Sequence, residues 1–237
     1  MPPANHSIII PFLNERSSAP ALLEAILPYE SERIWVDGGS VDGSAEWLSG
    51  RKETVLQSPC GRGAQLRLGA ESANGDVLWF LHADCLPPSA ATEAISAAIL
   101  RGAVGGAFTL SYERGLQLGI VSMTANLRTR ITGIPFGDQG IFCTRRAYDA
   151  AGGFRPLPIM EDVDFASRLR KTGRMVRLPD RIVSSPRRFD RRGILRTVLN
   201  DWRCQLAWMA GKSPERIARW YEDPSDPVRG SESPKGP

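Results

Sequence analysis

The sequence predicts an α/β fold in which helices flank a mostly parallel central sheet. Short apolar runs alternate with helical patterns through the first 100 residues, which is typical of βαβ units. The run Val77–Leu81 is unbroken and apolar, as expected for a strand buried on both faces. With 237 residues, 42% of them hydrophobic, the chain can bury a large core without disulfides or a structural metal.

The first half of the chain is predicted to alternate strands and helices. Each strand is a short apolar run bounded by polar, Gly or Pro residues. The predicted strands cover residues 7–12, 33–36, 54–57 and 77–81. The predicted helices cover about 19–27, a stretch capped by Ser44 that runs through Trp47, about 60–73, and 89–100 before Gly102.

The second half has a less regular pattern. Strands are predicted at 104–110, 136–143 and 175–178, and helices at 116–132, 146–151, 159–171 and 194–209. Residues 184–192 read as a basic loop. We expect one domain over residues 1–222. A disordered tail should follow over 223–237, because that segment is rich in Pro, Ser, Gly and charge.

The helix over 194–209 has a wide apolar stripe. That pattern favours a core helix. A homodimer contact or a peripheral membrane contact through residues 194–211 stays open as an alternative.

The composition restricts the class of ligand and the cellular compartment that we expect for this protein. The four cysteines are far apart and form no C-x-x-C pair, which indicates reduced thiols of a cytoplasmic protein. We find neither a signal-peptide pattern nor an apolar run long enough for a membrane helix. The net charge of +4 and the arginines between Arg168 and Arg219 suit an anionic ligand. Nucleotide, phospholipid surface and nucleic acid stay open, as does a solvated basic surface.

Acidic residues follow two of the predicted strands. Asp84 comes directly after the 77–81 strand, where ligands bind in open α/β sheets. It can serve as one ligand of a divalent cation, or it caps the turn into the next helix. Asp37 ends the 33–36 strand and points to the same edge if the sheet is parallel. Between them, Gly61-Arg62-Gly63 opens a helix and offers a weak anion-site signal.

A second acidic group opens the helix over 159–171. Glu161, Asp162 and Asp164 complement the dipole of the helix amino end. That effect does not explain why two acids stand side by side before an apolar residue. One of them, facing a cleft, can act as a general base.

Several motifs together resemble the family 2 glycosyltransferases of the GT-A fold, the nucleotide-diphospho-sugar transferase fold. They are SIIIPFLNE, VDGGSVDGS, FLHAD, GGAF, GDQGIF and MEDVDFASRLRKTG, in this order along residues 7 to about 221. The segments GRGAQ, FLHADC, GDQGIF and SSPRRFD further resemble a small bacterial stand-alone branch, which is associated with radical-SAM and arsenosugar biosynthesis genes.

The resemblance implies a role for each matching residue. The residues expected to bind the nucleotide sugar are Pro11, Glu15, Asp37, Arg62, His82, Asp84, Arg187 and Arg188. Asp84 occupies the metal position of the family's D-x-D motif, whose first acid is His82 here. Asp162, with Glu161 beside it, is expected to be the catalytic base. Phe189 stands where related enzymes have a tryptophan.

These roles predict an inverting transfer of a sugar from a nucleotide-diphosphate sugar to a hydroxyl acceptor. The expected cofactor is Mg²⁺ or Mn²⁺, and the acceptor is a small molecule, as in arsenosugar or related small-glycoside biosynthesis, or is lipid-linked. Two rivals are a non-catalytic nucleotide-sugar binder, which His82 mildly favours, and a nucleotidyltransferase, whose glycine-rich signature the chain lacks after its first strand. A nucleic-acid partner is not expected, because no recognised binding motif accompanies the basic residues.

Overall fold

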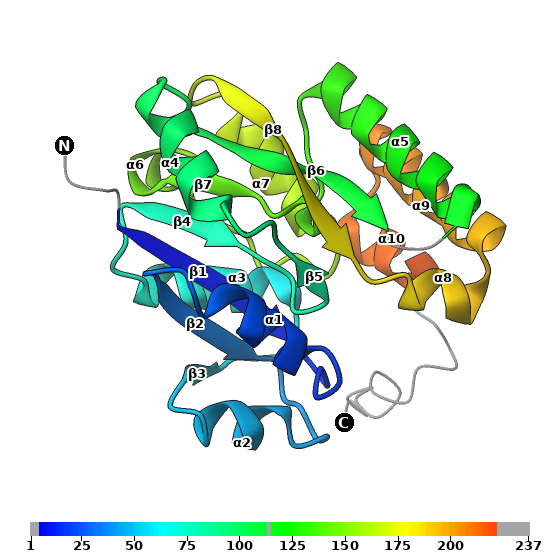
Figure 1. The fold of residues 1–237 in the computed structure, drawn as a ribbon. Coiled ribbons are helices and arrows are strands. Elements are labelled where there is room, and N and C mark those ends of the chain that lie inside the picture. Colours follow the sequence, from blue (N-terminus) through cyan, green and yellow to red (C-terminus); the bar gives the residue numbers. More distant parts are fainter. Residues whose placement is uncertain (1–4, 113–114, 222–237) are drawn as a thin grey trace, which may run out of the picture.

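The centre of the molecule is a mixed β-sheet. The computed structural model describes residues 5–112 and 115–221. Within them, an eight-stranded sheet has the strand order β3-β2-β1-β4-β7-β6-β8-β5. Helices cover both of its faces (Figure 1). The predicted α/β architecture is therefore confirmed.

One half of the sheet is parallel. Its strands are β1 (His6–Phe12), β2 (Glu32–Asp37), β3 (Thr54–Gln57) and β4 (Val77–Phe80), with β2 and β4 on either side of β1. The helices between them are α1 (Ala19–Ile26), α2 (Ser44–Ser49) and α3 (Arg62–Ser72). The chain steps outward from β1 to β3 and then returns to β4. This reversal creates a topological switch point between β1 and β4, where open α/β sheets bind ligands.

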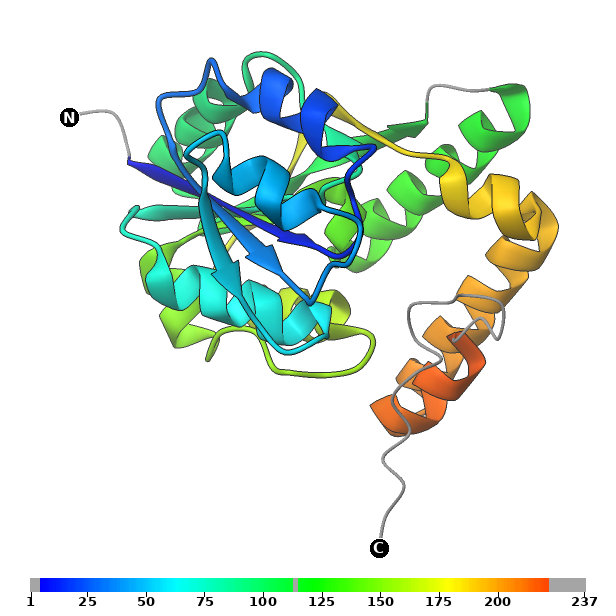
Figure 2. The same ribbon diagram turned by 90° about the horizontal axis from the view of Figure 1, so that it is seen from below.

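Alternating side chains of the central strands build two cores. Ile8 and Ile10 of β1 and Trp79 of β4 belong to the core under α1 and α4 (Ala91–Leu100). Ile9 and Phe80 belong to the core under α3 on the opposite face. The two-residue period of a strand thus explains why these runs are apolar at every position. Figure 2 shows helices above and below the sheet.

The other half of the sheet contains the antiparallel pairings, so the sheet is mostly parallel, as predicted, but mixed. Strand β7 (Phe142–Thr144) pairs antiparallel with both β4 and β6 (Gly105–Tyr112). Strand β8 (Met175–Ser184) runs parallel to β6, and the short β5 (Cys85–Leu86) pairs antiparallel with β8. A buried apolar run has the same composition in either direction, so strand direction could not be deduced from it.

The remaining helices mostly lie where the pattern predicted them. They are α5 (Gly115–Thr132), α6 (Arg145–Ala150), α7 (Glu161–Leu169) and α9 (Ile194–Met209). Three details were wrong. The N-cap residue of α2 is Gly43, not Ser44. The segment expected to be a basic loop is the end of β8 followed by α8 (Arg187–Arg192). Helix α10 (Pro214–Tyr221) was not predicted. The predicted tail lies outside the described residues.

Helix α9 is not the core helix that its stripe suggested. Its buried residues are the small ones, Thr197, Cys204 and Ala207, whereas Leu195 and Trp202 are exposed. Small side chains allow the helix to pack closely with that face, and the large apolar side chains remain outside. Among the described helices, none combines the length and hydropathy required to cross a bilayer.

Gly106 gives a direct test of the sheet packing. A Cβ at this position would lie 2.2 Å from the backbone oxygen of Val176 on the neighbouring strand. Gly106→Ala is therefore expected to lower the free energy of unfolding by about 3 kcal/mol in urea denaturation. The control is Gly119→Ala on α5, where a Cβ meets open space. It should raise stability by about 0.5–1 kcal/mol, and equal effects of the two changes would contradict the packing.

Candidate active site

Three of the predicted site residues meet at the switch point. Glu15 follows β1, Asp84 follows β4, and Arg187 opens α8. One Arg187 nitrogen lies 2.6 Å from Glu15 Oε2 and 3.7 Å from Asp84 Oδ2. Burial raises the pKa of the Glu15 carboxyl, although the hydrogen bond and the charge of Arg187 lower it in part. The arginine therefore links the ends of both central strands.

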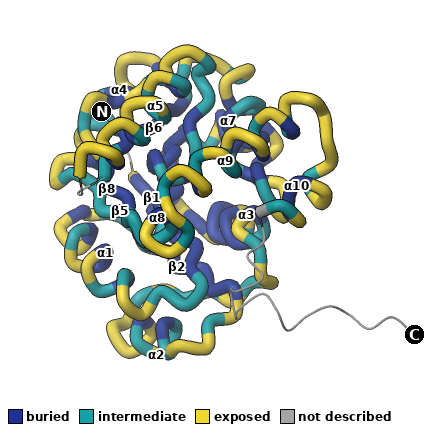
Figure 3. Tube along the Cα trace, turned by 90° about the vertical axis from the view of Figure 1, so that its right-hand side faces the viewer, coloured by how far each residue is buried: buried dark blue, intermediate teal, exposed yellow. Residues whose placement is uncertain are grey.

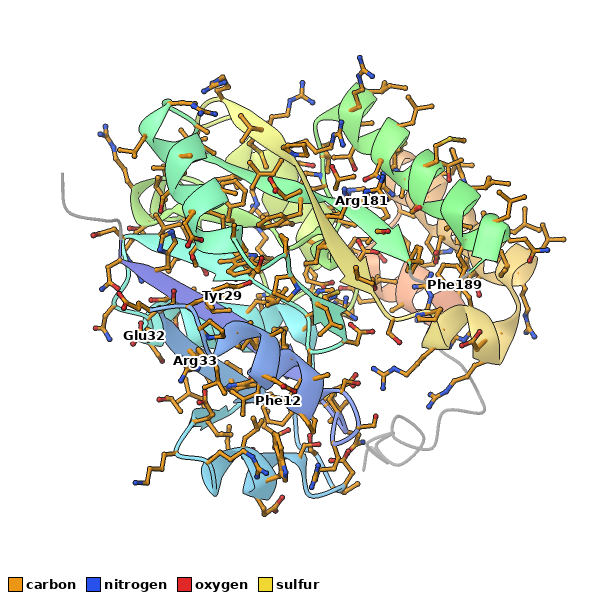
Figure 4. All side chains as sticks on the ribbon, viewed as in Figure 1. Phe12, Tyr29, Glu32, Arg33, Arg181 and Phe189 are labelled. Atoms are coloured by element: carbon orange, nitrogen blue, oxygen red, sulfur yellow. The ribbon has the colours of Figure 1, made fainter. Side chains whose placement is uncertain are left out.

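Helix α8 is held in place by contacts on either side of Arg187. The Ser185 N–H donates to the backbone oxygen of Asp84 at 3.0 Å. Phe189, labelled in Figure 4, packs edge-on against Tyr112 at the end of β6, with 5.3 Å between ring centroids. The guanidinium of Arg187 is thus positioned by its own helix before any ligand binds.

Asp37 and Pro11 lie at the predicted edge of the sheet, but β1 separates Asp37 from Asp84. Pro11 is buried in β1 and is paired with Val36 of β2. Asp37 is buried, and its Oδ1 accepts hydrogen bonds from Gly39 N–H and from both the N–H and the hydroxyl of Ser40. Asp37 therefore shapes the loop after β2.

The turn after β4 brings together a possible set of metal ligands. One ligand atom each of His82, Asp84 and Cys85 lies within 4.8 Å of the others. Burial raises the pKa of the Cys85 thiol well above its usual range, so the sulfur is protonated in the metal-free protein. Burial, aided by the charge of Arg62, lowers the pKa of His82 well below its usual range, which leaves a neutral imidazole.

This donor set fits a hard divalent cation. Asp84 supplies a carboxylate oxygen on a side chain that is 32% exposed, so water and phosphate oxygens have room beside it. Mg²⁺ and Mn²⁺ are commonly held by one or two carboxylates, several waters and substrate phosphates. The neutral imidazole of His82 is available as a second ligand.

The two adjacent acids at the start of α7 contact different neighbours. Asp162 Oδ2 accepts a hydrogen bond from Gly137 N–H at 2.7 Å. A Cβ on Gly137 would lie 2.5 Å from His82 Nε2, so only glycine fits between the imidazole and Asp162. Glu161 is buried and lies 3.5 Å from Arg62. Asp162 thus faces the turn that carries Asp84, and Glu161 faces α3.

Arg188 has another ion-pair partner, although its charge also acts on the buried carboxyl of Asp138. It forms an ion pair with Asp201 of α9. The predicted pair of arginines is therefore split, with Arg187 at the switch point and Arg188 joining α8 to α9.

The sequence reasoning missed Asp138. It lies in the 3₁₀ turn η1 (Gly137–Gln139), and its Oδ1 is buried without a hydrogen-bond partner among the described residues. Burial raises its pKa to about 6, and the charges of Asp162 and Asp84 add to this while Arg128 opposes it. A buried carboxylate oxygen without a hydrogen-bond partner is uncommon, and a raised pKa beside other acids favours a functional role. Asp138 belongs to the motif GDQGIF, but aspartate is common in turns, so the sequence alone did not single it out.

Two further positioning residues were also missed. Arg128 of α5 lies over the ring of Phe136, 3.3 Å from its centroid, and burial lowers its pKa although Asp138 and Asp162 oppose this. Gln65 of α3 donates from Nε2 to the backbone oxygens of Phe12 and Val36, at 2.8 and 2.7 Å. It ties together the ends of β1 and β2.

Asp138→Asn is expected to stabilise the metal-free protein at neutral pH. The pKa of about 6 in the folded protein lies above the ordinary 3.8 of an unfolded chain. Between these pH values, the folded protein therefore binds a proton that the unfolded chain has lost. That stabilisation is full below pH 3.8 and is lost as the pH rises through 6. Asparagine stays neutral, so the free energy of unfolding at pH 8 should rise by up to about 3 kcal/mol.

Urea denaturation across pH 4 to 8 measures this effect. The control is Asp149→Asn on the exposed face of α6, which should leave the pH dependence unchanged. If Asp138→Asn shows the same pH dependence as the unchanged protein, the carboxyl is not held in the protonated form.

Curated proteins match part of this chain in sequence. An undecaprenyl-phosphate 4-deoxy-4-formamido-L-arabinose transferase from Pseudomonas fluorescens is 33% identical over 161 residues, which are 60% of this chain and 46% of that protein. Its counterpart from Photorhabdus laumondii is 32% identical over 158 residues, covering 60% and 48%. The chain thus matches about half the length of these curated relatives.

Solved structures share the fold. S. aureus TarS 1–349 superposes with a TM-score of 0.63 at 17% identity, covering 78% of this chain and 62% of that one. Glucosyl-3-phosphoglycerate synthase from Mycobacterium tuberculosis, in complex with Mn²⁺, UDP-glucose and phosphoglyceric acid, has a TM-score of 0.55 at 15% identity. Those alignments cover 75% of this chain and 70% of the synthase. The pattern described as "Glycosyl transferase family 2" matches residues 7–152, and the chain accordingly belongs to this family of glycosyltransferases.

Proposed function

We propose that the chain is an inverting, metal-dependent glycosyltransferase that moves a sugar from a nucleotide-diphosphate sugar to a hydroxyl acceptor. The observation that carries this proposal is the convergence of Asp84 and Asp162 on one turn at the switch point. Asp84 lies beside Arg187, and Asp162 is separated from His82 by a single glycine. One carboxylate is thus available for a metal and another for a base.

The donor is assigned to the carboxyl ends of β1, β2 and β4. Asp37 and Pro11 would border the base of the nucleotide, and Glu15 and Arg62 would lie along the donor. TarS has been solved with UDP and with UDP-GlcNAc, and the mycobacterial synthase with UDP-glucose, which supports a uridine nucleotide as the first donor to try.

Asp84 would hold Mg²⁺ or Mn²⁺, with His82 as an available second ligand. A bound divalent ion would neutralise part of the negative charge that develops on the diphosphate leaving group. Arg187 adds a fixed positive charge at the same place, and electrostatic stabilisation of this kind contributes several kcal/mol to lowering a barrier. Mn²⁺ in the mycobacterial synthase supports the choice of metal.

Asp162 would be the general base. Its carboxylate takes the proton of the acceptor hydroxyl while the hydroxyl oxygen forms a bond to the anomeric carbon. The bond from that carbon to the diphosphate breaks on the opposite face, so the configuration inverts and the nucleoside diphosphate leaves. The Gly137 N–H orients Asp162, and Glu161 pairs with Arg62 rather than acting on the acceptor.

The acceptor is part of the proposal. The branch resemblance of GRGAQ, FLHADC, GDQGIF and SSPRRFD supports a small acceptor in arsenosugar or related glycoside biosynthesis. The undecaprenyl-phosphate transferases support a lipid-linked acceptor. A cytoplasmic setting, where nucleotide sugars are made, is supported by the free cysteines Cys60, Cys85, Cys143 and Cys204.

Asp162→Asn tests the base. Asparagine still accepts the Gly137 hydrogen bond but cannot take a proton, so transfer should fall by about 10²–10⁴-fold. Calorimetry should show UDP binding unchanged. Unaltered transfer with the Asn variant would rule out Asp162 as the base.

Asp84→Asn tests the metal site. Mn²⁺ should strengthen UDP binding to the unchanged protein in calorimetry, and this enhancement should disappear in the variant, because the carboxylate ligand is lost. Asp149→Asn, on the exposed face of α6, should retain it. If EDTA changes neither UDP affinity nor transfer in the unchanged protein, metal dependence is refuted.

A further inference from the structure

The large apolar side chains that the structure leaves exposed are concentrated on two helices. On α5, Leu116, Ile120, Met123, Leu127 and Ile131 are 52–84% exposed. On α9, Leu195, Leu199, Trp202, Leu206 and Met209 are 51–75% exposed. We call these sets the α5 stripe and the α9 stripe. The other exposed large apolar residues, Leu27, Val41 and Leu100, are scattered singly, as is normal for a soluble surface.

Each stripe lies on the exposed face of its helix, and the two helices are on the same side of the molecule. Their residues recur at intervals of three and four, which places each stripe on one line along its helix. The buried residues of α5 (Leu118, Ser122, Thr129) and of α9 (Thr197, Cys204, Ala207) lie on the opposite helix faces. Helices α5 and α9 contact each other, and Figure 3 looks onto the side that carries them together with α8.

Exposed arginines lie on the helices that carry the stripes and on the neighbouring α8. On α5, Arg130 is exposed and the helix contains no acidic residue. On α8 and α9, Arg191, Arg196 and Arg203 are exposed. The acids of α8 and α9 are Asp190 and Asp201, and Asp201 is paired with Arg188. The surface is thus apolar along two lines and positively charged at its rim.

We propose that α5 and α9 together form a docking surface for an anionic phospholipid bilayer. Leu, Ile, Met and Trp side chains enter the interface, and the arginines contact lipid phosphates, as in helices that lie in the membrane plane. A second copy of the chain fits the surface less well, because it would bring one basic rim against another.

The docking surface adjoins the candidate site. On α5, the Thr129 hydroxyl donates to Gln139 Oε1 of η1 at 2.8 Å, and Arg128 lies over the ring of Phe136, next to Gly137. Resting on the proposed function, this places Asp162 beside the bilayer and makes a lipid-linked hydroxyl or phosphate the acceptor class. A soluble acceptor would not require this surface.

Vesicle flotation of the full chain tests the docking. Vesicles of phosphatidylglycerol and phosphatidylcholine should carry the protein, and pure phosphatidylcholine should carry much less. Triple substitution to Gln should reduce the partition coefficient by about tenfold or more. The sets are Ile120, Met123 and Leu127 on α5, and Leu199, Trp202 and Leu206 on α9.

A matched control uses the scattered apolar residues. Leu27→Gln, Val41→Gln and Leu100→Gln together remove equally exposed side chains and should leave flotation unchanged. Arg191→Gln with Arg196→Gln should weaken binding to anionic vesicles by about fivefold for each arginine and reduce its salt dependence.

Flotation requires no turnover, so it is independent of the enzyme assay. Calorimetric UDP binding by each stripe variant verifies that the fold persists. Absence of flotation in the unchanged protein, or equal loss in the control variant, overturns the docking surface. Sedimentation that shows a dimer dissociated by the stripe substitutions also overturns it, in favour of a second copy. Failure of UDP binding with intact flotation rejects the proposed function alone.

Discussion

The close contact of Gly137 with His82 and Asp162 is the constraint on which the candidate site depends. It joins the two halves of the sheet. His82 belongs to the turn after β4 in the parallel half, and Gly137 opens the turn that leads into β7 in the mixed half. Because no Cβ fits at Gly137, the imidazole, the glycine N–H and the Asp162 carboxylate stay together. The packing of Phe80 of β4 on Phe165 of α7 already brings these elements together, and the Gly137 contact fixes the side chains themselves.

A second constraint comes from the far end of the chain. Arg187 bonds to Glu15, which is 172 residues earlier, and so draws α8 over the ends of β1 and β4. The region matched by the family pattern ends at residue 152, before Glu161, Asp162 and Arg187. The roles proposed for those residues therefore depend on the geometry of this chain. The same α8 leads into α9, so the helix that carries Arg187 of the proposed donor site also leads into the proposed membrane surface.

The sequence predicted the parallel half well, because β1 contains the apolar run Ile8–Ile10, β4 is apolar throughout, and turn residues follow each strand. The direction of β7 could not be predicted, because parallel and antiparallel pairing cannot be distinguished from the sequence of a three-residue strand. The sequence identified α9 as amphipathic but chose the wrong face, because small residues such as Cys204 and Ala207 pack closely while large ones stay outside. Asp138 was overlooked because its burial arises from tertiary packing around η1, which local sequence does not show.

The central claim is that Asp84, Gly137 and Asp162 surround one metal-bound nucleotide. Paramagnetic broadening of backbone amide resonances, recorded with Mn²⁺ and UDP, measures this arrangement directly. The amides of these three residues should broaden most, and those of Ser7 and Val77, at the opposite ends of β1 and β4, should stay sharp. Strong broadening at Ser7 and Val77, with sharp signals from Gly137 and Asp162, would contradict it.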